Sequence, residues 1–353
     1  MLNDIKISDF FKNLSKYDLI IDSRSPKEFS HSKIPNAVNF FALSDEEHHE
    51  IGTIYKNESS SKAKVLGASY ICKNVSSHLQ EIYKNYPLGS EIAIYCARGG
   101  LRSASMAIIL SHTGYLVERI EQGYKAYRRY VLEYLERFEH KNFIVLCGNT
   151  GCGKSELLAN LDTSIKTETL ANHFGSTFGS IKGVQPSQKE FQNLLAYALF
   201  NIDPKEWIYV EAESKKIGSI IQPELFFNRT HNGFKVLISA PLELRIQRIM
   251  RDYQAVDAAF FYASMNHIKP YIQRKFFDAA LESFDKNELE KVAEILLLEY
   301  YDKVYRQPNE VHRHLHVKDI SSAVNELKEL KKELSKESNN FRVIIIIYNL
   351  STL

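Results

Sequence analysis

The stretch Phe143–Leu161, FIVLCGNTGCGKSELLANL, decides the fold of the second half of this chain. Its apolar start, FIVLC, predicts a buried strand, and Glu156–Leu161 begins a helix. Between them GNTGCGKS at 148–155 matches G-x-x-x-x-G-K-[ST] in full, in the strand–loop–helix context that a phosphate-binding P-loop requires. Backbone amides of such a loop cradle a diphosphate, its lysine bridges the oxygens, and its serine can ligate Mg²⁺. The residues predicted to bind a diphosphate are Gly148, Thr150, Gly151, Cys152, Gly153, Lys154 and Ser155.

The sequence after the P-loop extends this α/β pattern. Further strands are predicted at Trp207–Val210 and Lys235–Ser239, which gives a P-loop α/β domain over residues 142–254. Residues 255–335 are almost wholly helical in pattern. Residues 336–353 form an apolar tail, for which the sequence indicates either one more strand or a frayed end, and no function.

The N-terminal part has its own alternation of strands and helices. Strands are predicted at 17–21 and 91–95, and helices at Val75–Tyr86 and Ser103–His112. We therefore expect a parallel-sheet α/β domain over residues 1–130. The charged segment Tyr124–His140 is expected to be helical, with residues 131–141 as the connector between the two domains.

A second motif, YCARGGLRS at 95–103, places a cysteine between a buried strand and a helix. Backbone amides of a glycine loop and a helix N-terminus form an anion cradle, and guanidinium groups add positive charge. These groups lower the pKa of a thiol, and the thiolate is the nucleophile. We expect an exposed Cys96 to be catalytic and the anion to be bound by Arg98, Gly99, Gly100 and Arg102.

Two families share this kind of loop. Cys96 and Arg102 have the Cys-x5-Arg spacing of cysteine phosphatases, so the loop by itself leaves phosphate and sulfur chemistry open. The segment 20–40, IIDSRSPKEFSHSKIPNAVNF, resembles the opening of rhodanese domains, and residue 95 is tyrosine where tyrosine phosphatases carry histidine. The resemblance favours a rhodanese-like domain, with a phosphatase of related fold as the alternative.

Further candidates lie downstream of the P-loop. WIYVEAES at 207–214 puts two carboxylates on one strand face, and APLELRIQRIMR at 240–251 puts two arginines one helical turn apart. HFGSTFG at 173–179 is a glycine-aromatic loop that suits an apolar ligand, whereas the alternating histidines at 312–316 lack the partners of a metal site. Solvated charges and a hydrophobic turn are the alternatives. The candidates are Arg245 and Arg248 for phosphate contacts, Phe174 and Phe178 for an apolar tail, and Ser155 and Glu211 for Mg²⁺.

Composition narrows the class of protein. The 353 residues include 45 Lys and Arg and 43 Asp and Glu, a net charge of +2, which excludes the strong global field of a non-specific nucleic-acid binder. A hydrophobic content of 44% excludes wholesale disorder. Four cysteines without a C-x-x-C pair, no signal peptide and no run long enough to span a bilayer predict a cytoplasmic protein that does not enter a membrane.

The two motifs in one chain, with the segments around them, strongly resemble the tRNA 2-selenouridine synthase family over about residues 15–305. DEEHHEIGTIYK at 45–56 and LANHFGSTFG at 170–179 make the resemblance specific, because neither is a general rhodanese or P-loop feature. The remaining segments are DSRSPKEF at 22–29, EQGYKAYR at 121–128, QPSQKEF at 185–191, EAESKKIG at 211–218 and YYDKVY at 300–305.

The resemblance implies a tRNA-modifying transferase that replaces sulfur by selenium in 5-substituted 2-thiouridine at the wobble position. Selenophosphate and geranyl diphosphate are its implied co-substrates, with Mg²⁺ a further candidate, and the thiouridine sulfur is geranylated first. Cys96 would carry selenium as an S-selanyl group. The implied partners are tRNA and, as a further candidate, a selenophosphate-producing enzyme.

Recognition of tRNA requires phosphate contacts and stacking on bases. The candidate contacts are Lys125, Arg128, Arg129, Lys269, Tyr271, Arg274 and Lys275, for which a solvated helix face is the alternative. Two other functions fit the same motifs. One is a sulfurtransferase or cysteine phosphatase fused to a small-molecule kinase, and the other is a non-catalytic module that binds anions.

Overall fold

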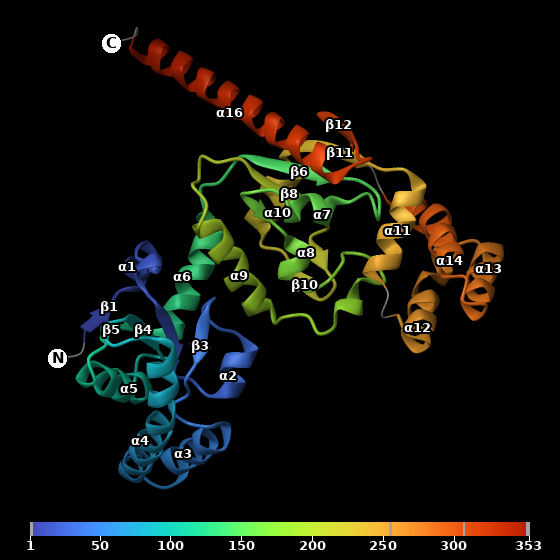
Figure 1. Cartoon of the computed structure of the whole chain (residues 1–353). Coiled ribbons are helices and arrows are strands. Elements are labelled where there is room, and N and C mark those ends of the chain that lie inside the picture. Colours follow the sequence, from blue (N-terminus) through green and yellow to red (C-terminus); the bar gives the residue numbers. More distant parts are fainter. Residues whose placement is uncertain (1–2, 254–255, 306–307, 351–353) are drawn as a thin grey trace. The chain divides into compact units, whose positions relative to one another are not determined.

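The computed structural model describes residues 3–253, 256–305 and 308–350, without side chains beyond residue 336. The chain divides into two compact units. Unit 1 comprises Met1–Arg137 and Pro186–Tyr197, and unit 2 comprises Phe138–Gln185 and Ala198–Leu353. Each unit is an α/β structure on a parallel sheet, and unit 2 ends in a helical C-terminal region, so the expected α/β fold class is confirmed (Figure 1).

Unit 1 is built on a parallel five-stranded sheet in the order β1-β5-β4-β2-β3. Its strands are β1 (Asn3–Ile5), β2 (Leu19–Asp22), β3 (Ala37–Asn39), β4 (Glu91–Tyr95) and β5 (Leu116–Ile120). Its helices are α1 (Ile7–Lys12), α2 (Pro26–His31), α3 (Asp45–Asn57), α4 (Ser60–Asn85), α5 (Leu101–His112) and α6 (Gly123–Arg137), with a short 3-10 turn at Leu14–Lys16. The apolar side chains of β2 and β4 pack against α4 and α5 and form the core.

Helix α6 belongs to unit 1, which corrects the expected connector at 131–141. Val131 and Leu135 are buried, and the Phe11 ring of α1 stacks on Tyr127 and Tyr130 with centroids 5.7 and 4.7 Å apart. The helix ends at Arg137, and the chain enters unit 2 at the next residue. Helix α6, whose sequence is rich in charged residues, therefore contributes an apolar face to the core of unit 1.

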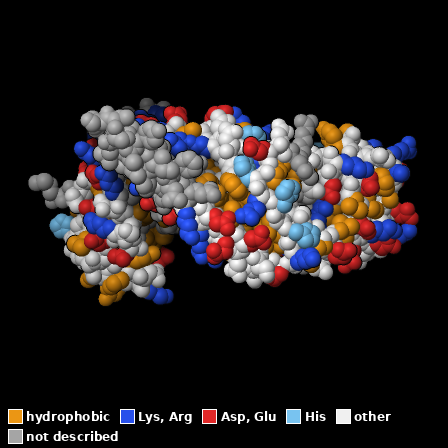
Figure 2. All heavy atoms as spheres, turned by 90° about the horizontal axis from the view of Figure 1, so that it is seen from above, with side chains coloured by type: hydrophobic (Ala, Val, Ile, Leu, Met, Phe, Trp, Pro, Cys, Tyr) orange, Lys and Arg blue, Asp and Glu red, His pale blue; other side chains and the backbone are white. Residues whose placement is uncertain are grey.

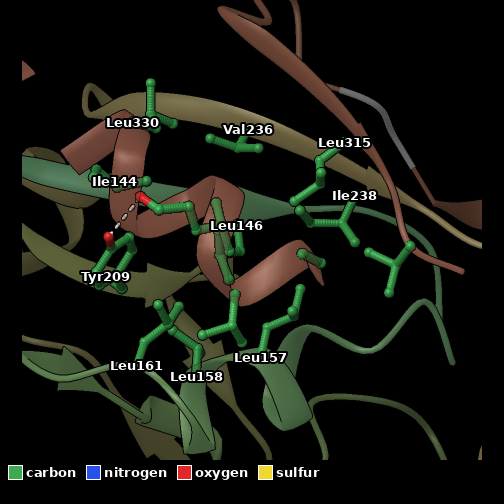
Figure 3. Packing of buried hydrophobic residues seen from close by; sticks show 14 of the residues in the cluster. Ile144, Leu146, Leu157, Leu158, Leu161, Tyr209, Val236, Ile238, Leu315 and Leu330 are labelled. Carbon is green, nitrogen blue, oxygen red and sulfur yellow. Dashed lines mark hydrogen bonds between the residues drawn. The ribbon is translucent and has the colours of Figure 1, made fainter. Parts of the chain in front are cut away.

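Unit 2 carries a second parallel five-stranded sheet in the order β12-β11-β6-β8-β7. Its strands are β6 (Phe143–Cys147), β7 (Ser164–Ile165), β8 (Ile208–Glu211), β11 (Phe234–Ser239) and β12 (Arg313–His316), and β9 (Lys216–Ile217) with β10 (Ile220–Ile221) forms a separate antiparallel pair. The first helices are α7 (Lys154–Ala159), α8 (Thr167–Leu170), α10 (Glu224–His231) and α11 (Leu242–Asp252), with a 3-10 turn at Gly179–Lys182. Helix α9 (Gln188–Phe200) lies mostly in unit 1, because residues 186–197 belong to that unit. Figure 3 shows Leu157 and Leu158 of α7 packed under Leu146 of the sheet, while the Tyr209 hydroxyl donates to the Leu327 carbonyl at 2.8 Å.

The C-terminal region is mostly helical. It contains α12 (Ala258–Ile268), a 3-10 turn (Lys269–Tyr271), α13 (Arg274–Asp285), α14 (Leu289–Leu296), a π-helical segment (Leu297–Tyr301), α15 (Asp302–Val304) and α16 (Ile320–Leu350). Strand β12 interrupts this helical pattern. Polar and apolar residues alternate in its sequence RHLH, so Leu315 is buried, and the strand pairs with β11 at the edge of the sheet.

The expected strand or frayed end after residue 336 is wrong in the described part of the chain, because α16 continues to Leu350. Residues 320–350 contain no glycine or proline to stop a helix. No helix among the described residues has both the length and the apolar content needed to cross a membrane. On the face in Figure 2, acidic and basic side chains are intermixed.

Candidate active sites

The loop after β4 surrounds the sulfur of Cys96 with hydrogen-bond donors. The Gly100 amide donates to Sγ at 3.1 Å, and the Ser103 hydroxyl donates to it at 3.2 Å. The cysteine is 3% exposed, so the expectation of an exposed thiol is wrong. The reason is the loop itself, which folds back over the sulfur in order to aim its donors at it.

These donors govern the ionisation of the thiol. Burial by itself raises the pKa of Cys96. The hydrogen bonds from the Ser103 hydroxyl and from the backbone of Ser103 and Arg98, together with the charge of Arg102, outweigh burial and leave the pKa below its ordinary value. The sulfur is therefore held in an environment that favours the thiolate.

Gly123, at the start of α6, fixes the position of this loop. The Tyr124 amide donates to the Cys96 carbonyl at 2.8 Å, and the Lys125 amide donates to the Ala97 carbonyl at 3.0 Å. A Cβ atom at Gly123 would lie 2.1 Å from the Cys96 carbonyl oxygen, and the residue has φ of +54°. Only glycine fits this approach. Gly123 was not among the predicted site residues, although it lies in the segment EQGYKAYR at 121–128.

The two arginines of the loop differ in their surroundings. Arg98 is exposed, whereas the Arg102 guanidinium donates to Glu28 at 2.5 Å and is 16% exposed. Glu28 also accepts from the Ser25 amide at 3.1 Å in the capping box of α2. Burial raises the pKa of Glu28, but the bond and charge of Arg102 lower it below its usual range. Glu28 thus holds Arg102 in place beside the loop.

A buried ion pair lies beneath the same edge of the sheet. Arg24, 4% exposed, binds Asp22 through Nε at 3.0 Å and Nη2 at 2.6 Å, and the Tyr95 hydroxyl donates to Asp22 at 2.7 Å. The Arg24 guanidinium lies 3.8 Å from the centroid of the Tyr124 ring. Asp22 and Tyr95 end adjacent strands, so the network ties β2, β4 and α6 together where the Cys96 loop begins.

Helix α9 completes this network. Neither this helix nor its Asn193 was among the predicted site residues. Asn193 is fully buried, its amide donates to the Lys33 carbonyl at 2.7 Å and to the Tyr124 hydroxyl at 2.9 Å, and its oxygen accepts from Arg128. The Lys33 amide in turn donates to Glu190 at 2.8 Å. Residues 186–197 are therefore part of unit 1, which corrects the expected continuous P-loop domain over 142–254. The sequence feature that could have indicated a role for this helix is the segment QPSQKEF at 185–191, one of those that carry the family resemblance.

In unit 2 the P-loop has the backbone that its glycines predict. Gly148, Gly151 and Gly153 have φ of +144°, +79° and +99°, and a Cβ atom at Gly148 would lie 2.2 Å from the Ile238 carbonyl oxygen. The Lys154 ammonium donates to the Gly148 carbonyl at 2.6 Å. Cys152 is buried in the core of unit 2, so it contributes its backbone and a small side chain to the loop.

Three carboxylates lie near this lysine. The Ser155 hydroxyl donates to Glu168 at 3.2 Å, and Glu211 accepts from the Thr167 hydroxyl and the Glu168 amide, both at 2.8 Å. Burial and then the negative charge of Glu168 raise the pKa of Glu211 to about 7, and the same two causes raise that of Glu213. Burial by itself lowers the pKa of Lys154. The electrostatic effects of Cys152, Glu168 and Glu213 are larger than that of burial, so the pKa of Lys154 is raised.

Within the described residues, no group of three or more His, Cys, Asp or Glu side chains is placed to hold a metal ion. The carboxylate beside Ser155 is that of Glu168 and not that of Glu211, which the sequence had paired with it as a candidate Mg²⁺ ligand. Because Thr167 and the backbone occupy an oxygen of Glu211, this side chain anchors α8 to β8.

The two arginines of α11 both reach the P-loop. Arg245 binds both oxygens of Asp302, at 2.9 and 2.6 Å, and donates to the Thr150 carbonyl at 3.0 Å. Arg245 therefore supports the P-loop from outside. This differs from the expected phosphate contact, because the negative charge that Arg245 binds is that of Asp302. Arg248 donates to the Gly151 carbonyl at 3.2 Å, and its guanidinium lies over Gly153.

A cavity of about 830 Å³ opens beside the P-loop within unit 2. Lys154, Ser155 and Arg248 line its polar part, and its aromatic lining consists of Phe174, Tyr253, Tyr300, Tyr301 and Tyr305. The segment YYDKVY thus contributes to the site, and the Tyr305 oxygen accepts from the Gly148 amide at 2.7 Å.

The two phenylalanines of the 173–179 loop lie in different places. Phe174 lines the cavity, with its ring 5.5 Å from that of Tyr253. Phe178 is 5% exposed and packs on Phe261 in the core of the helical region. The expectation that Phe178 contacts a ligand is therefore corrected, because its ring fills the space between helices.

The candidate tRNA contacts are mostly on the surface. Exposed residues among them are Lys125, Arg129, Lys269, Tyr271, Arg274 and Lys275. Arg128 is different, because its guanidinium binds Gln192 at 2.7 Å and Asn193 of α9. Its role in the structure is to hold that helix.

Comparison with known proteins gives a consistent result. Residues 141–273 match the family model of the tRNA 2-selenouridine synthase AAA domain, and residues 7–130 match that of the rhodanese-like domain. A tRNA 2-selenouridine synthase of Hydrogenovibrio crunogenus is 33% identical over 330 residues, which cover 84% of this chain and 91% of that protein. A protein of the same name from Shewanella denitrificans is 31% identical over 318 residues, which cover 81% and 87%. Among solved structures, a rhodanese-related protein from Thermoplasma volcanium has 21% identity and a TM-score of 0.25, and the match covers 36% of this chain and 92% of that one.

Proposed function

Since the chain belongs to the tRNA 2-selenouridine synthase family, we propose that it replaces sulfur by selenium at C2 of 5-substituted 2-thiouridine, at the wobble position of tRNA. The reaction has two parts. Geranyl diphosphate first alkylates the thiouridine sulfur, and a selenium nucleophile derived from selenophosphate then displaces the geranylated sulfur. A thiocarbonyl sulfur leaves poorly, whereas an alkylated sulfur leaves as a thiol.

The P-loop cavity is the proposed site of alkylation. The C1–O bond of geranyl diphosphate breaks, the bond between C1 and the thiouridine sulfur forms, and the base loses its N3 proton. Inorganic diphosphate leaves with the electron pair of the broken bond. Lys154 and the loop amides stabilise the charge that develops on it, as they would in phosphoryl transfer. The observation that carries this proposal is the aromatic lining of the same cavity, which suits a hydrocarbon chain.

The loop of Cys96 is the proposed selenium site. Arg98 and the loop amides would bind the phosphate group of selenophosphate, and Arg102 adds positive charge while paired with Glu28. Cys96 is proposed to be required for this step as an ionised sulfur, the form that its donors favour. Selenium of selenophosphate forms the bond to C2, the geranylated sulfur leaves as geranyl thiol, and water hydrolyses the Se–P bond to release phosphate. Selenide-level selenium would need a two-electron oxidant to form an S-selanyl group on Cys96, so no such group is proposed. Surface residues such as Lys125 and Lys275 are proposed to contact tRNA phosphates.

A divalent cation is compatible with the P-loop site. The Ser155 oxygen can still act as a ligand while its hydroxyl donates to Glu168, and a cation there would offset the repulsion between Glu168 and Glu213. Ser155 would hold Mg²⁺ together with oxygens of the bound diphosphate and water. The ion would neutralise charge on the leaving diphosphate.

Nucleoside mass spectrometry after incubation with thiolated tRNA, geranyl diphosphate and selenophosphate tests the proposal. We expect Lys154→Ala to abolish geranylation and Cys96→Ser to retain geranylation but lose selenouridine. Lys205→Ala and Cys72→Ser are matched controls, because both side chains are exposed. Unchanged geranylation in Lys154→Ala would contradict the role of the P-loop.

The same experiment separates the alternatives. A sulfurtransferase or cysteine phosphatase fused to a kinase predicts thiocyanate formation or phosphate release, together with turnover of nucleoside triphosphate. A binding module predicts no turnover of any of these substrates.

A further inference from the structure

Four tyrosines line the P-loop cavity, and three of them are named here the tyrosine wall: Tyr253, Tyr300 and Tyr301. Tyr253 follows α11, and the other two close the π-helical segment Leu297–Tyr301. Phe174 lies against Tyr253 with the ring centroids 5.5 Å apart. The wall therefore forms an aromatic surface in the same cavity as Lys154 and Ser155.

The π-helical segment explains how two consecutive tyrosines reach one cavity. A π turn is wider than an α turn and rotates the chain less per residue, so neighbouring side chains diverge less. The Tyr300 and Tyr301 rings are 4.9 Å apart, and both line the cavity. Single π turns inside helices occur frequently at functional sites.

The hydroxyl groups of the wall are bonded to the 173–179 loop. The Tyr300 hydroxyl is 2.8 Å from the Thr177 hydroxyl, and the Tyr253 hydroxyl is 3.0 Å from that of Ser176. Burial raises the pKa of Tyr253 to about 12, so this hydroxyl keeps its proton at neutral pH. With their polar ends bonded, the rings offer apolar surface to a ligand.

We propose that the tyrosine wall selects the length of the hydrocarbon chain on the diphosphate bound at the P-loop, with Tyr300 as the specificity-determining residue. This inference rests on the proposed function, because it assumes that the ligand is a prenyl diphosphate. The wall is fixed at its hydroxyl ends by Thr177 and Ser176, so its rings do not move aside freely for a longer chain. A pocket wall of this kind distinguishes substrates that differ by one methylene by about ten- to two-hundredfold.

Competition between geranyl and farnesyl diphosphate tests the inference in the full-length protein. The measured quantity is the ratio of farnesyl to geranyl transferred to thiolated tRNA, with the ratio of the two dissociation constants as a second readout. Tyr300→Ala removes the ring, and we expect the farnesyl-to-geranyl ratio to rise about tenfold or more. Tyr300→Phe keeps the ring but removes the bond to Thr177 that fixes it, so its ratio should lie between those of the unmodified protein and of Tyr300→Ala.

Tyr300→Leu guards against a folding defect, because it keeps an apolar side chain of intermediate size and should give an intermediate ratio. Thermal unfolding is measured for each variant. A folded Tyr300→Leu or Tyr300→Ala protein with an unchanged ratio would overturn the role of the wall.

If the proposed function is wrong, the competition experiment gives a different result from the one expected if only the chain-length inference is wrong. In that case the unmodified protein binds neither prenyl diphosphate, and the length inference falls with it. If the unmodified protein transfers geranyl and only the ratio fails to respond to Tyr300→Ala, the proposed function stands and the tyrosine wall does not select chain length.

Discussion

Removal of the Ser103 hydroxyl is the sharpest test of how the Cys96 loop works. Ser103 is fully buried on α5, and its hydroxyl donates to the Cys96 sulfur at 3.2 Å. A hydrogen bond to a charged group contributes about 1.5–3 kcal/mol, and one pKa unit corresponds to about 1.4 kcal/mol. We therefore expect Ser103→Ala to raise the pKa of Cys96 by about one to two units.

The sign of the pH dependence follows from this shift. The thiolate is the reactive form, so the rate of Cys96 alkylation rises with pH through the pKa of Cys96 and is level above it. In Ser103→Ala the rise moves to higher pH. Below the pKa of Cys96 in the unmodified protein the rate falls by about ten- to a hundredfold, the loss shrinks between the two pKa values, and the plateau at high pH changes less.

The assay is the pH dependence of Cys96 alkylation by iodoacetamide, followed by mass spectrometry of the labelled peptide. Cys72→Ser serves as the background because Cys72 is exposed and would compete for the reagent. Burial raises the pKa of Cys147 to about 11, which keeps this thiol unreactive at neutral pH. Ser111→Ala is the matched control, since Ser111 is exposed on the same helix. An alkylation profile of Ser103→Ala that coincides with that of the control would refute the reasoning.

Three further substitutions test the support of the two sites. Gly123→Ala should destabilise unit 1 by about 3 kcal/mol or more, measured by urea unfolding, because its Cβ would lie 2.1 Å from the Cys96 carbonyl oxygen. Asp302→Asn should cost about 2 kcal/mol of stability and weaken diphosphate binding about tenfold, measured by calorimetry, since Arg245 loses a bidentate partner. Asn193→Ala should cost about 3–5 kcal/mol in urea unfolding, because it leaves buried donors and acceptors of unit 1 unpaired.

Each of these substitutions has a control on the surface. Gly52→Ala lies on α3 with open space around the added carbon, and Asn57→Ala ends the same helix in an exposed position. Asp278→Asn removes an exposed carboxylate on α13. If a buried variant unfolds at the same urea concentration as its control, the contact assigned to that residue does not stabilise the protein.

Local sequence predicted the strands and loops that carry the two sites. FIVLC and EIAIY became β6 and β4 without change, because a run of apolar residues followed by a glycine loop has few alternative structures. The positions of Cys96, directly after β4, and of Lys154, at the start of the helix that follows the loop after β6, were therefore predicted.

Long-range contacts could not be predicted in this way. Asn193 binds Lys33 and Tyr124, which are far away in the sequence, and nothing near position 193 indicates such partners. The burial of Cys96 depends on the path of the loop around the sulfur, and the burial of Phe178 depends on helices that follow much later. In each of these cases tertiary packing, and not local propensity, determines where the side chain lies.

Because most of α9 belongs to unit 1 although unit 2 residues flank it in the sequence, the chain cannot simply be divided at one point. A fragment that ends at Arg137 would keep every strand of the first sheet but lack residues 186–197, so Arg128 and Tyr124 would face solvent or misfold around the missing helix. Exchanging the first unit for a free-standing rhodanese, or expressing the halves as separate genes, therefore requires moving an internal segment and not merely cutting a linker. Substitutions in α9 and in the residues of unit 1 that bind it must remain compatible with each other, which couples the evolution of the two units.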